Sequence, residues 1–73
     1  MARAAVLGEA VRTAGFALAG AVVLTAENAG EARAAWRSLP ADVAVVILTP
    51  RAAAWLGDAV QHPRDVLRVV MPV

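Results

Sequence analysis

The first candidate ligand-binding residues are the three glycines in the stretch "VLGEAVRTAGFALAG" (6–20). A glycine-bearing turn after a short apolar run is where nucleotide-binding folds hold phosphate. A P-loop also needs a lysine, which "GEAVRTAG" lacks, and a dinucleotide fingerprint needs glycines much closer together than Gly8, Gly15 and Gly20. The pattern therefore predicts backbone roles: a strand-ending turn at Gly8, a close helix contact at Gly15 and a second turn at Gly20.

Side chains that could act as nucleophiles, bases or metal ligands are few and scattered. The sequence has no cysteine, and its one histidine, His62, stands beside a proline near a predicted helix end. No base is placed to activate Thr25 or Thr49, which end predicted strands. A receiver domain needs a phosphoacceptor aspartate at the end of its third strand, where this chain has Leu48 and Thr49. We expect no catalysis by this chain alone, no cofactor and no nucleotide binding.

Composition and charge narrow the class of protein. Seventy-three residues fit one small domain spanning 1–73. Seven arginines are nearly balanced by six acidic residues and are spread along the chain, which argues against nucleic-acid binding. The longest uncharged run, 13–26, is shorter than the ~20 residues of a membrane-spanning helix, so we expect no direct membrane insertion. A secretory leader at the amino terminus stays open as an alternative, although Glu9 and the glycines weaken it.

Short apolar runs alternate with longer mixed segments along the whole chain. Such runs, rich in valine and bounded by turn residues, are typical of buried strands, and they cover 3–8, 20–25, 42–49 and 65–73. Strands that alternate with helices predict an α/β fold: a small four-stranded parallel sheet with helices on both faces, of the flavodoxin-like or receiver-like kind. The strand residues expected to be buried are Val6, Val22, Leu24, Val45, Ile47 and Val69.

The segments between the runs carry helix signals of different strength. Asn28, with Glu31 three residues later, resembles a capping box, and Pro40 follows the expected helix end. Gly15 lowers the helix propensity of 9–19, so we expect a short or broken helix there. The expected core face of the helix after Asn28 consists of Ala32, Ala35, Trp36 and Leu39.

A third helix is expected after the third apolar run. Thr49 can cap it, Pro50 suits its first position, and Pro63 ends it. Trp55, on the edge of its apolar stripe, is interpreted either as a core residue or as an anchor for a partner. That stripe consists of Ala52, Leu56, Ala59 and Val60.

The stretch 6–20 resembles the amino-terminal signature of a small central-stalk protein, the F subunit of the V-type and A-type rotary ATPases. In that family a first strand ending in glycine and acidic residues is followed by Gly-Phe-x-Leu-Ala-Gly. "NAGEARAAWRSL" (28–39) is similar to the family's second helix, and "VAVVILTPRAAAWL" (43–56) is similar to its third strand and following turn, with Thr49 and Arg51 at matching positions. The signature residues here are Gly8, Gly15, Phe16, Leu18, Ala19 and Gly20.

The resemblance implies a non-catalytic subunit of the central rotor stalk of a proton- or sodium-translocating ATPase or ATP synthase. Such a subunit binds the coiled-coil shaft, which is the D subunit, and lies with the rest of the complex in the cytoplasm, peripheral to the membrane. The acidic residues that follow the family's first strand are reduced here to Glu9, and the family's carboxy-terminal helix has no counterpart after Val73. The residues expected at the partner interface are Glu9, Glu27, Thr49, Arg51, Trp55 and Arg68.

Two other interpretations stay open. One is a receiver-like or small-ligand-binding α/β module without a phosphoacceptor. The other is a small secreted protein with a cleaved leader. Co-purification with a coiled-coil protein of the ATPase would favour the rotor-stalk interpretation over the small-ligand-binding module. An intact Met1 or Ala2 terminus in the mature protein would exclude the secreted protein with a cleaved leader.

Overall fold

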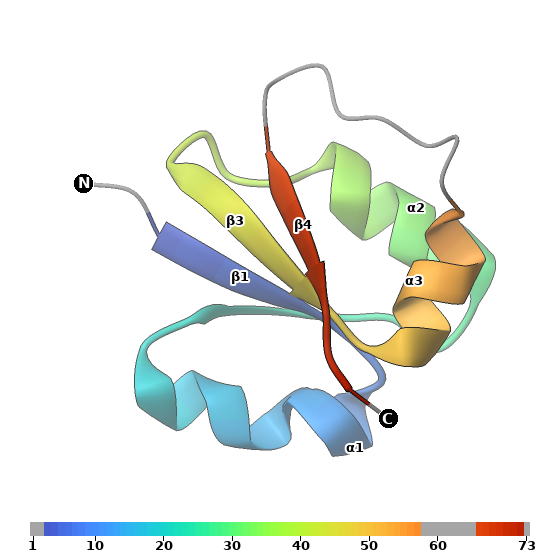
Figure 1. Cartoon of the computed structure of the whole chain (residues 1–73), viewed down its shortest axis with the longest axis horizontal. Coiled ribbons are helices and arrows are strands. Elements are labelled where there is room, and N and C mark those ends of the chain that lie inside the picture. The colour runs from blue at the N-terminus through green and yellow to red at the C-terminus, as the bar shows by residue number, and fades with distance from the viewer. Residues whose placement is uncertain (1–2, 58–65, 73) are drawn as a thin grey trace.

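The computed structural model describes residues 3–57 and 66–72, and it places a parallel sheet between helices (Figure 1). The order of the strands across the sheet is β2-β1-β3-β4, and each neighbouring pair is parallel. This confirms the predicted small α/β fold. The strands are β1 (Arg3–Gly8), β2 (Val22–Thr25), β3 (Val43–Leu48) and β4 (Leu67–Val70). The helical segments are α1 (Ala10–Thr13), the 3₁₀ helix η1 (Ala14–Ala19), α2 (Ala29–Arg37) and α3 (Pro50–Leu56).

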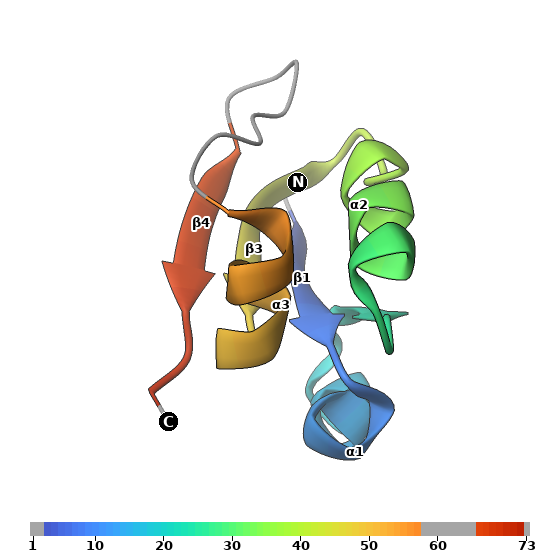
Figure 2. The same cartoon turned by 90° about the vertical axis from the view of Figure 1, so that its right-hand side faces the viewer.

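The described helices cover the two faces of the sheet unequally. On one face, α1 contacts β1 and β2, and η1 contacts β2. On the other face, α2 and α3 pack against each other and against the strands (Figures 1 and 2). Right-handed crossovers explain this division, because the step from β1 to β2 runs one way across the sheet and the two later steps run the other way. Among residues 3–57 and 66–72, one face therefore carries two helices and the other carries the continuous α1–η1 segment.

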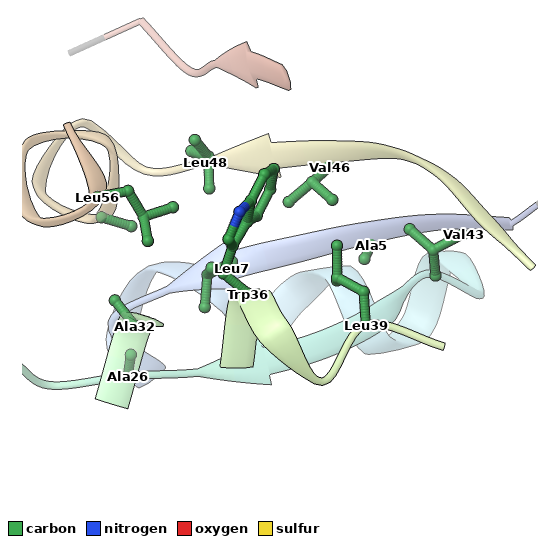
Figure 3. Close-up of a cluster of buried hydrophobic side chains, with 11 residues drawn as sticks. Ala5, Leu7, Ala26, Ala32, Trp36, Leu39, Val43, Val46, Leu48 and Leu56 are labelled. Carbon is green, nitrogen blue, oxygen red and sulfur yellow. The ribbon is translucent and has the colours of Figure 1, made fainter. Parts of the chain in front are cut away.

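The face under α2 and α3 holds the main core (Figure 3). Trp36 of α2 is its largest side chain and is only 2% exposed. Because side chains alternate along a strand, Ala5 and Leu7 of β1 and Val46 and Leu48 of β3 lie on this face, and an irregularity in the pairing of β1 with β3 brings Val43 into the same core. Ala32 and Trp36 are buried and Ala35 is half-buried, which confirms the expected face of α2. Leu39 is buried in the same core but follows the end of the helix. The strand residues in this core are Ala5, Leu7, Val43, Val46 and Leu48.

The cap at the start of α2 is formed as predicted, with one difference. The Asn28 side chain accepts a hydrogen bond from the Glu31 backbone amide at 2.8 Å. In a capping box the glutamate side chain would return this bond to the amide of the cap residue. Here the Glu31 carboxylate accepts instead from the amide of Glu27, one residue earlier, at 2.9 Å. Glu31 therefore bonds to both residues that precede α2, Glu27 and Asn28, and these two bonds fix the start of the helix.

The segment between β1 and β2 is the short, broken helix that the sequence predicts. One turn of α-helix, α1, passes directly into η1, and buried Thr13 at the junction donates its hydroxyl to the carbonyl of Glu9 at 3.2 Å. Gly20 has a φ of +84°, which confirms the predicted turn. The predicted close helix contact at Gly15 is wrong, because a Cβ built there would meet nothing within 4 Å. Gly15 is exposed, so its lack of a side chain serves no packing contact.

The strand residues expected to be buried give a mixed result. Val6 is fully buried, as predicted, but Val69 is 43% exposed, so that prediction is wrong. The expectation assumed that helices cover both faces of the whole sheet, whereas the main contacts of α1 and η1 in the described residues are with β1 and β2. The remaining four expected residues are only half-buried: Val22, Leu24, Val45 and Ile47.

Helix α3 starts as predicted and ends early. Thr49 caps it through a hydrogen bond from the amide of Ala52, and Pro50 occupies its first turn. The helix ends at Leu56 rather than near Pro63, because Gly57 adopts a φ of +70° and breaks the helical geometry. The remaining expectations for this segment lie outside the described residues: Ala59, Val60, His62 and Pro63.

Candidate functional site

The polar residues that follow β1, β2 and β3 lie together at the carboxyl end of the sheet, here called the rim. The hydroxyl of Thr49 donates a short hydrogen bond to the Glu9 carboxylate and accepts one from the Ala52 amide at 3.2 Å. Thr49 is fully buried, while Glu9 is half-buried. The contact joins the end of β1 to the start of α3 across 40 positions of sequence. Its two polar groups therefore satisfy each other within the fold.

Gly8 allows this contact because it has no side chain. A Cβ at Gly8 would lie 2.5 Å from Oγ1 and 2.8 Å from Cβ of Thr49, and closer still to its Cγ2, all far inside contact distance. The backbones are also tied, since the Thr49 amide donates to the Leu7 carbonyl at 3.1 Å. The first glycine of the signature thus makes room for a threonine and is not arranged to hold phosphate.

A second contact of the rim links β2 to α1. The Glu27 carboxylate accepts a hydrogen bond from the backbone amide of Ala10 at 2.9 Å. The backbone continues the link, because the Ala26 amide donates to the Gly8 carbonyl at 3.0 Å. A carboxylate at the amino terminus of a helix is favourable, because the first amides of the helix have no partner within it. Hydrogen bonds between the protein's own groups therefore link β1 to the segments on both of its sides at the rim.

Charge at the rim centres on Glu9. The hydrogen bond from Thr49 lowers the pKa of the Glu9 carboxyl, and its own backbone amide and the positive charges of Arg51 and Arg12 lower it further. Partial burial opposes these effects but does not reverse them. Both arginines are exposed. The rim thus presents guanidinium groups to solvent around one internally bonded carboxylate.

Acid is expected to weaken the fold through Glu9. Because the folded protein lowers the pKa of this carboxyl, its stabilising effect is complete above the ordinary pKa of about 4.3 and is lost as the pH falls through the lower folded value. Glu9→Gln and Thr49→Val should both flatten the loss of stability between about pH 5 and pH 3. Urea unfolding midpoints at several pH values measure this slope. Asp42→Asn should flatten the slope as well, because Arg3 lowers the pKa of Asp42, and it does so at a place separate from the rim. Slopes equal to the wild-type slope in both rim variants would contradict the prediction.

Two predicted interface residues lie away from the rim. Trp55 is half-buried and packs against the main core from α3. Arg68 of β4 lies over the ring of Trp36, with its guanidinium carbon 5.3 Å from the ring centroid, and donates to the Gly57 carbonyl at 3.1 Å. The structure therefore brings Glu9, Glu27, Thr49 and Arg51 together and places Trp55 and Arg68 over the α2–α3 core.

The signature residues serve the backbone path from α1 to β2. Gly15 and Phe16 lie in η1, with Gly15 exposed and Phe16 half-buried, and Gly20 makes the turn into β2. The backbone of Leu18 and Ala19 belongs to η1, and their side chains lie outside the described part of the structure.

The turn at Gly20 could be predicted from the sequence, but the hydrogen bond between Glu9 and Thr49 was not predicted. Its only signal was that both residues directly follow neighbouring parallel strands.

Within residues 3–57 and 66–72, no group of three histidine, cysteine or acidic side chains is placed to hold a metal ion. No helix in the same part of the chain is long and apolar enough to cross a membrane.

The chain is a small α/β protein whose strand order is compatible with the first four strands of the flavodoxin-like arrangement. A comparison with protein-family models finds no matching family, and a comparison with curated proteins finds no match. An assignment of function therefore depends on the residues and the geometry given above.

Proposed function

We propose that this chain is a non-catalytic, protein-binding stalk subunit of the kind that the resemblance implies. It binds the coiled-coil shaft in the central stalk of a V/A-type rotary ATPase or ATP synthase, on the cytoplasmic side. The observation that carries the proposal is the bond between Glu9 and Thr49 at the rim. In doubly wound sheets, small ligands bind outside the carboxyl ends of the strands where the strand order reverses, which here is between β1 and β3. There the hydroxyl of Thr49 and the carboxylate of Glu9 bond to each other, which favours a protein partner over a small ligand.

The residues of the resemblance support the same proposal. Gly8 gives room to Thr49, and Gly20 makes a left-handed turn, so both glycines have backbone roles. A stalk subunit needs such a rigid frame, because it must turn with the shaft without deforming. Arg51, at the position that matches the family, is exposed in the first turn of α3. An arginine fork there can hold a carboxylate of the shaft through two hydrogen bonds.

Arg51→Ala is expected to weaken binding to the shaft by at least ~1 kcal/mol, about fivefold in affinity, while leaving the fold almost unchanged. The side chain is exposed and caps nothing, so its loss should cost little stability. Titration of the whole chain with the coiled-coil hairpin of the shaft protein, followed by calorimetry, measures the effect.

Arg33→Ala is the matched control, because Arg33 is an exposed helical arginine on α2, away from the rim. It should bind the hairpin as the unchanged chain does. If Arg51→Ala binds the hairpin as tightly as the unchanged chain does, Arg51 is a solvated side chain outside the interface. Trp55 then becomes the next candidate for an interface residue. Saturable micromolar binding of ATP, ADP or acetyl phosphate with magnesium would favour the small-ligand module instead.

A further inference from the structure

The acidic side chains and the arginines of the described residues are used in different ways. Within residues 3–57 and 66–72, every carboxylate accepts a hydrogen bond from another group of the protein. The acceptors and their donors are Asp42 with the Arg3 side chain, Glu9 with the Thr49 hydroxyl, Glu27 with the Ala10 amide and Glu31 with the Glu27 amide. In the same part of the chain, the exposed guanidinium groups of Arg12 and Arg51 make no hydrogen bond and no ion pair. The acidic groups therefore stabilise the fold, while these two arginines are available to a partner.

Arg12 and Arg51 come from different helices that start from the same bonded pair of residues. The backbone amide of Arg12 donates to the Glu9 carbonyl at 3.0 Å, and Arg51 lies in the first turn of α3, just after Thr49. The Thr49 hydroxyl bonds to the Glu9 carboxylate, so α1 and α3 begin at the same end of the sheet (Figure 1). The positive charges of both arginines act on that carboxylate. The two guanidinium groups therefore belong to one region of the rim.

The backbone that carries both arginines is held in place. Next to Arg12, the Thr13 side chain is fully buried and donates its hydroxyl to a backbone carbonyl of the preceding turn at 3.2 Å. Next to Arg51, Ala52 is fully buried and its amide donates to the Thr49 hydroxyl at 3.2 Å. A partner that contacts these arginines has to order only their side chains, which lowers the entropy cost of binding.

Carboxylates suit this region better than a phosphate group does. Phosphate sites in α/β folds use backbone amides at the start of a helix. Here the Ala10 amide donates to Glu27, and the Arg12 amide donates to the Glu9 carbonyl. A phosphate group carries close to two negative charges, so the Glu9 carboxylate would repel it about twice as strongly as it repels a carboxylate. An arginine fork holds a carboxylate through two parallel hydrogen bonds, so two arginines on separate helices match two carboxylates of one acidic segment.

We propose that Arg12 and Arg51 together bind an acidic segment of a partner protein, with one carboxylate on each guanidinium group. The proposal rests on the proposed function for the partner being a protein. It adds Arg12 to the interface and makes the contact acidic on the partner's side. In the free protein, the Glu9 carboxylate offsets the repulsion between the two positive charges, and its bond to Thr49 keeps it in place.

The first test follows the arginine side chains of the unchanged chain by NMR, with a short synthetic poly-glutamate peptide as the probe. We expect the Nε–H signals of Arg12 and Arg51 to shift with one common saturation curve. The signals of Arg33 and Arg37, which are exposed on α2 away from the rim, should shift little. A poly-glutamine peptide of equal length should shift none of them. Because exposed charges make the contact, added salt should weaken it.

The second test compares three variants that make the same change at exposed positions, so all three should fold. They are Arg12→Gln, Arg51→Gln and the control Arg33→Gln. We expect each of the first two to weaken binding of the poly-glutamate peptide by about threefold or more, and Arg33→Gln to leave it unchanged. The same order of affinities is expected with the coiled-coil hairpin of the shaft protein as the probe.

The other outcomes separate this proposal from the proposed function. No saturable shift with the poly-glutamate peptide, normal binding by Arg12→Gln, or equal losses in all three variants would overturn the acidic contact. Inorganic phosphate that shifts the same two signals at a lower concentration than the peptide would assign the region to phosphate instead. If Arg12→Gln binds the hairpin as tightly as the unchanged chain does, the proposed function survives and the acidic contact fails. If the unchanged chain binds the peptide through Arg12 and Arg51 but does not bind the hairpin, the proposed function fails and the rim remains a site for an acidic protein.

Discussion

Replacing Trp36 with alanine is expected to cost about 3–5 kcal/mol of the free energy of unfolding. The indole is only 2% exposed and lies in the centre of the core between α2 and the sheet (Figure 3). Its loss leaves a cavity lined by Leu7, Val46 and Leu48, and it also removes the ring on which Arg68 rests. One core in so small a chain supplies only about 3–5 kcal/mol of net stability. We therefore expect the variant to be largely unfolded in far-UV circular dichroism and in urea titration.

Trp55→Ala is the matched control for this prediction. It removes the same side chain, but from a half-buried position where Trp55 packs on the outside of the core. The loss should be clearly smaller than for Trp36→Ala, and the variant should remain folded. Equal losses at the two positions, or a cooperative unfolding transition of nearly unchanged midpoint for Trp36→Ala, would contradict the assignment of Trp36 as the central core residue.

The elements of this fold could be predicted from the sequence because their signals are local. The cap at Asn28 depends on Glu31, three residues away, and the start of α3 depends on the adjacent pair Thr49 and Pro50. The strands are short valine-rich runs bounded by turn residues, and their alternation with helices favours a parallel sheet. Gly57 shows where this reasoning is limited, because a glycine in a helical pattern can either be tolerated or end the helix. Here its positive φ ends α3.

The exposure of β4 could not be predicted, because it depends on parts of the chain far from it in sequence. Val6 and Val69 look alike in their runs, yet Val6 is fully buried and Val69 is not. The difference arises from the strand order, which puts β1 in the middle of the sheet under α1 and β4 at its edge. A strand pattern gives the two faces of a strand but does not say how many helices will cover each face.

Glu9, Glu27 and Thr49 were predicted as interface residues but not as members of a hydrogen-bond network. They lie together at the rim because parallel strands end at the same side of a sheet, and their side chains bond to groups of the neighbouring elements there. The particular bonds depend on side-chain reach and on the backbone approach at Gly8. Arg68 illustrates the same limit, since its place over Trp36 follows from the pairing of β4 with β3.

Gly8→Ala is expected to destabilise the fold by about 1–3 kcal/mol, although alanine usually stabilises a chain relative to glycine. The new Cβ would lie 2.5 Å from Oγ1 and 2.8 Å from Cβ of Thr49. Neither side can yield easily, because Thr49 is fully buried, its amide is bonded to Leu7, and its hydroxyl holds both Glu9 and Ala52. The end of β1 or the start of α3 must shift. Urea unfolding of the variant measures the cost.

Gly15→Ala separates this steric effect from the general effect of removing a glycine. A Cβ at Gly15 meets nothing within 4 Å, and its φ is not positive, so the change should be neutral or stabilising by up to about 1 kcal/mol. A double-mutant cycle with Thr49→Gly then tests the cause directly. Glycine is tolerated at a helix cap for a few tenths of a kcal/mol, and it removes the three atoms that lie nearest to the new Cβ. In that background Gly8→Ala should cost almost nothing, which gives a coupling free energy of at least about 1 kcal/mol between the two positions. If Gly8→Ala costs the same in both backgrounds, the glycine is required for some reason other than the approach of Thr49.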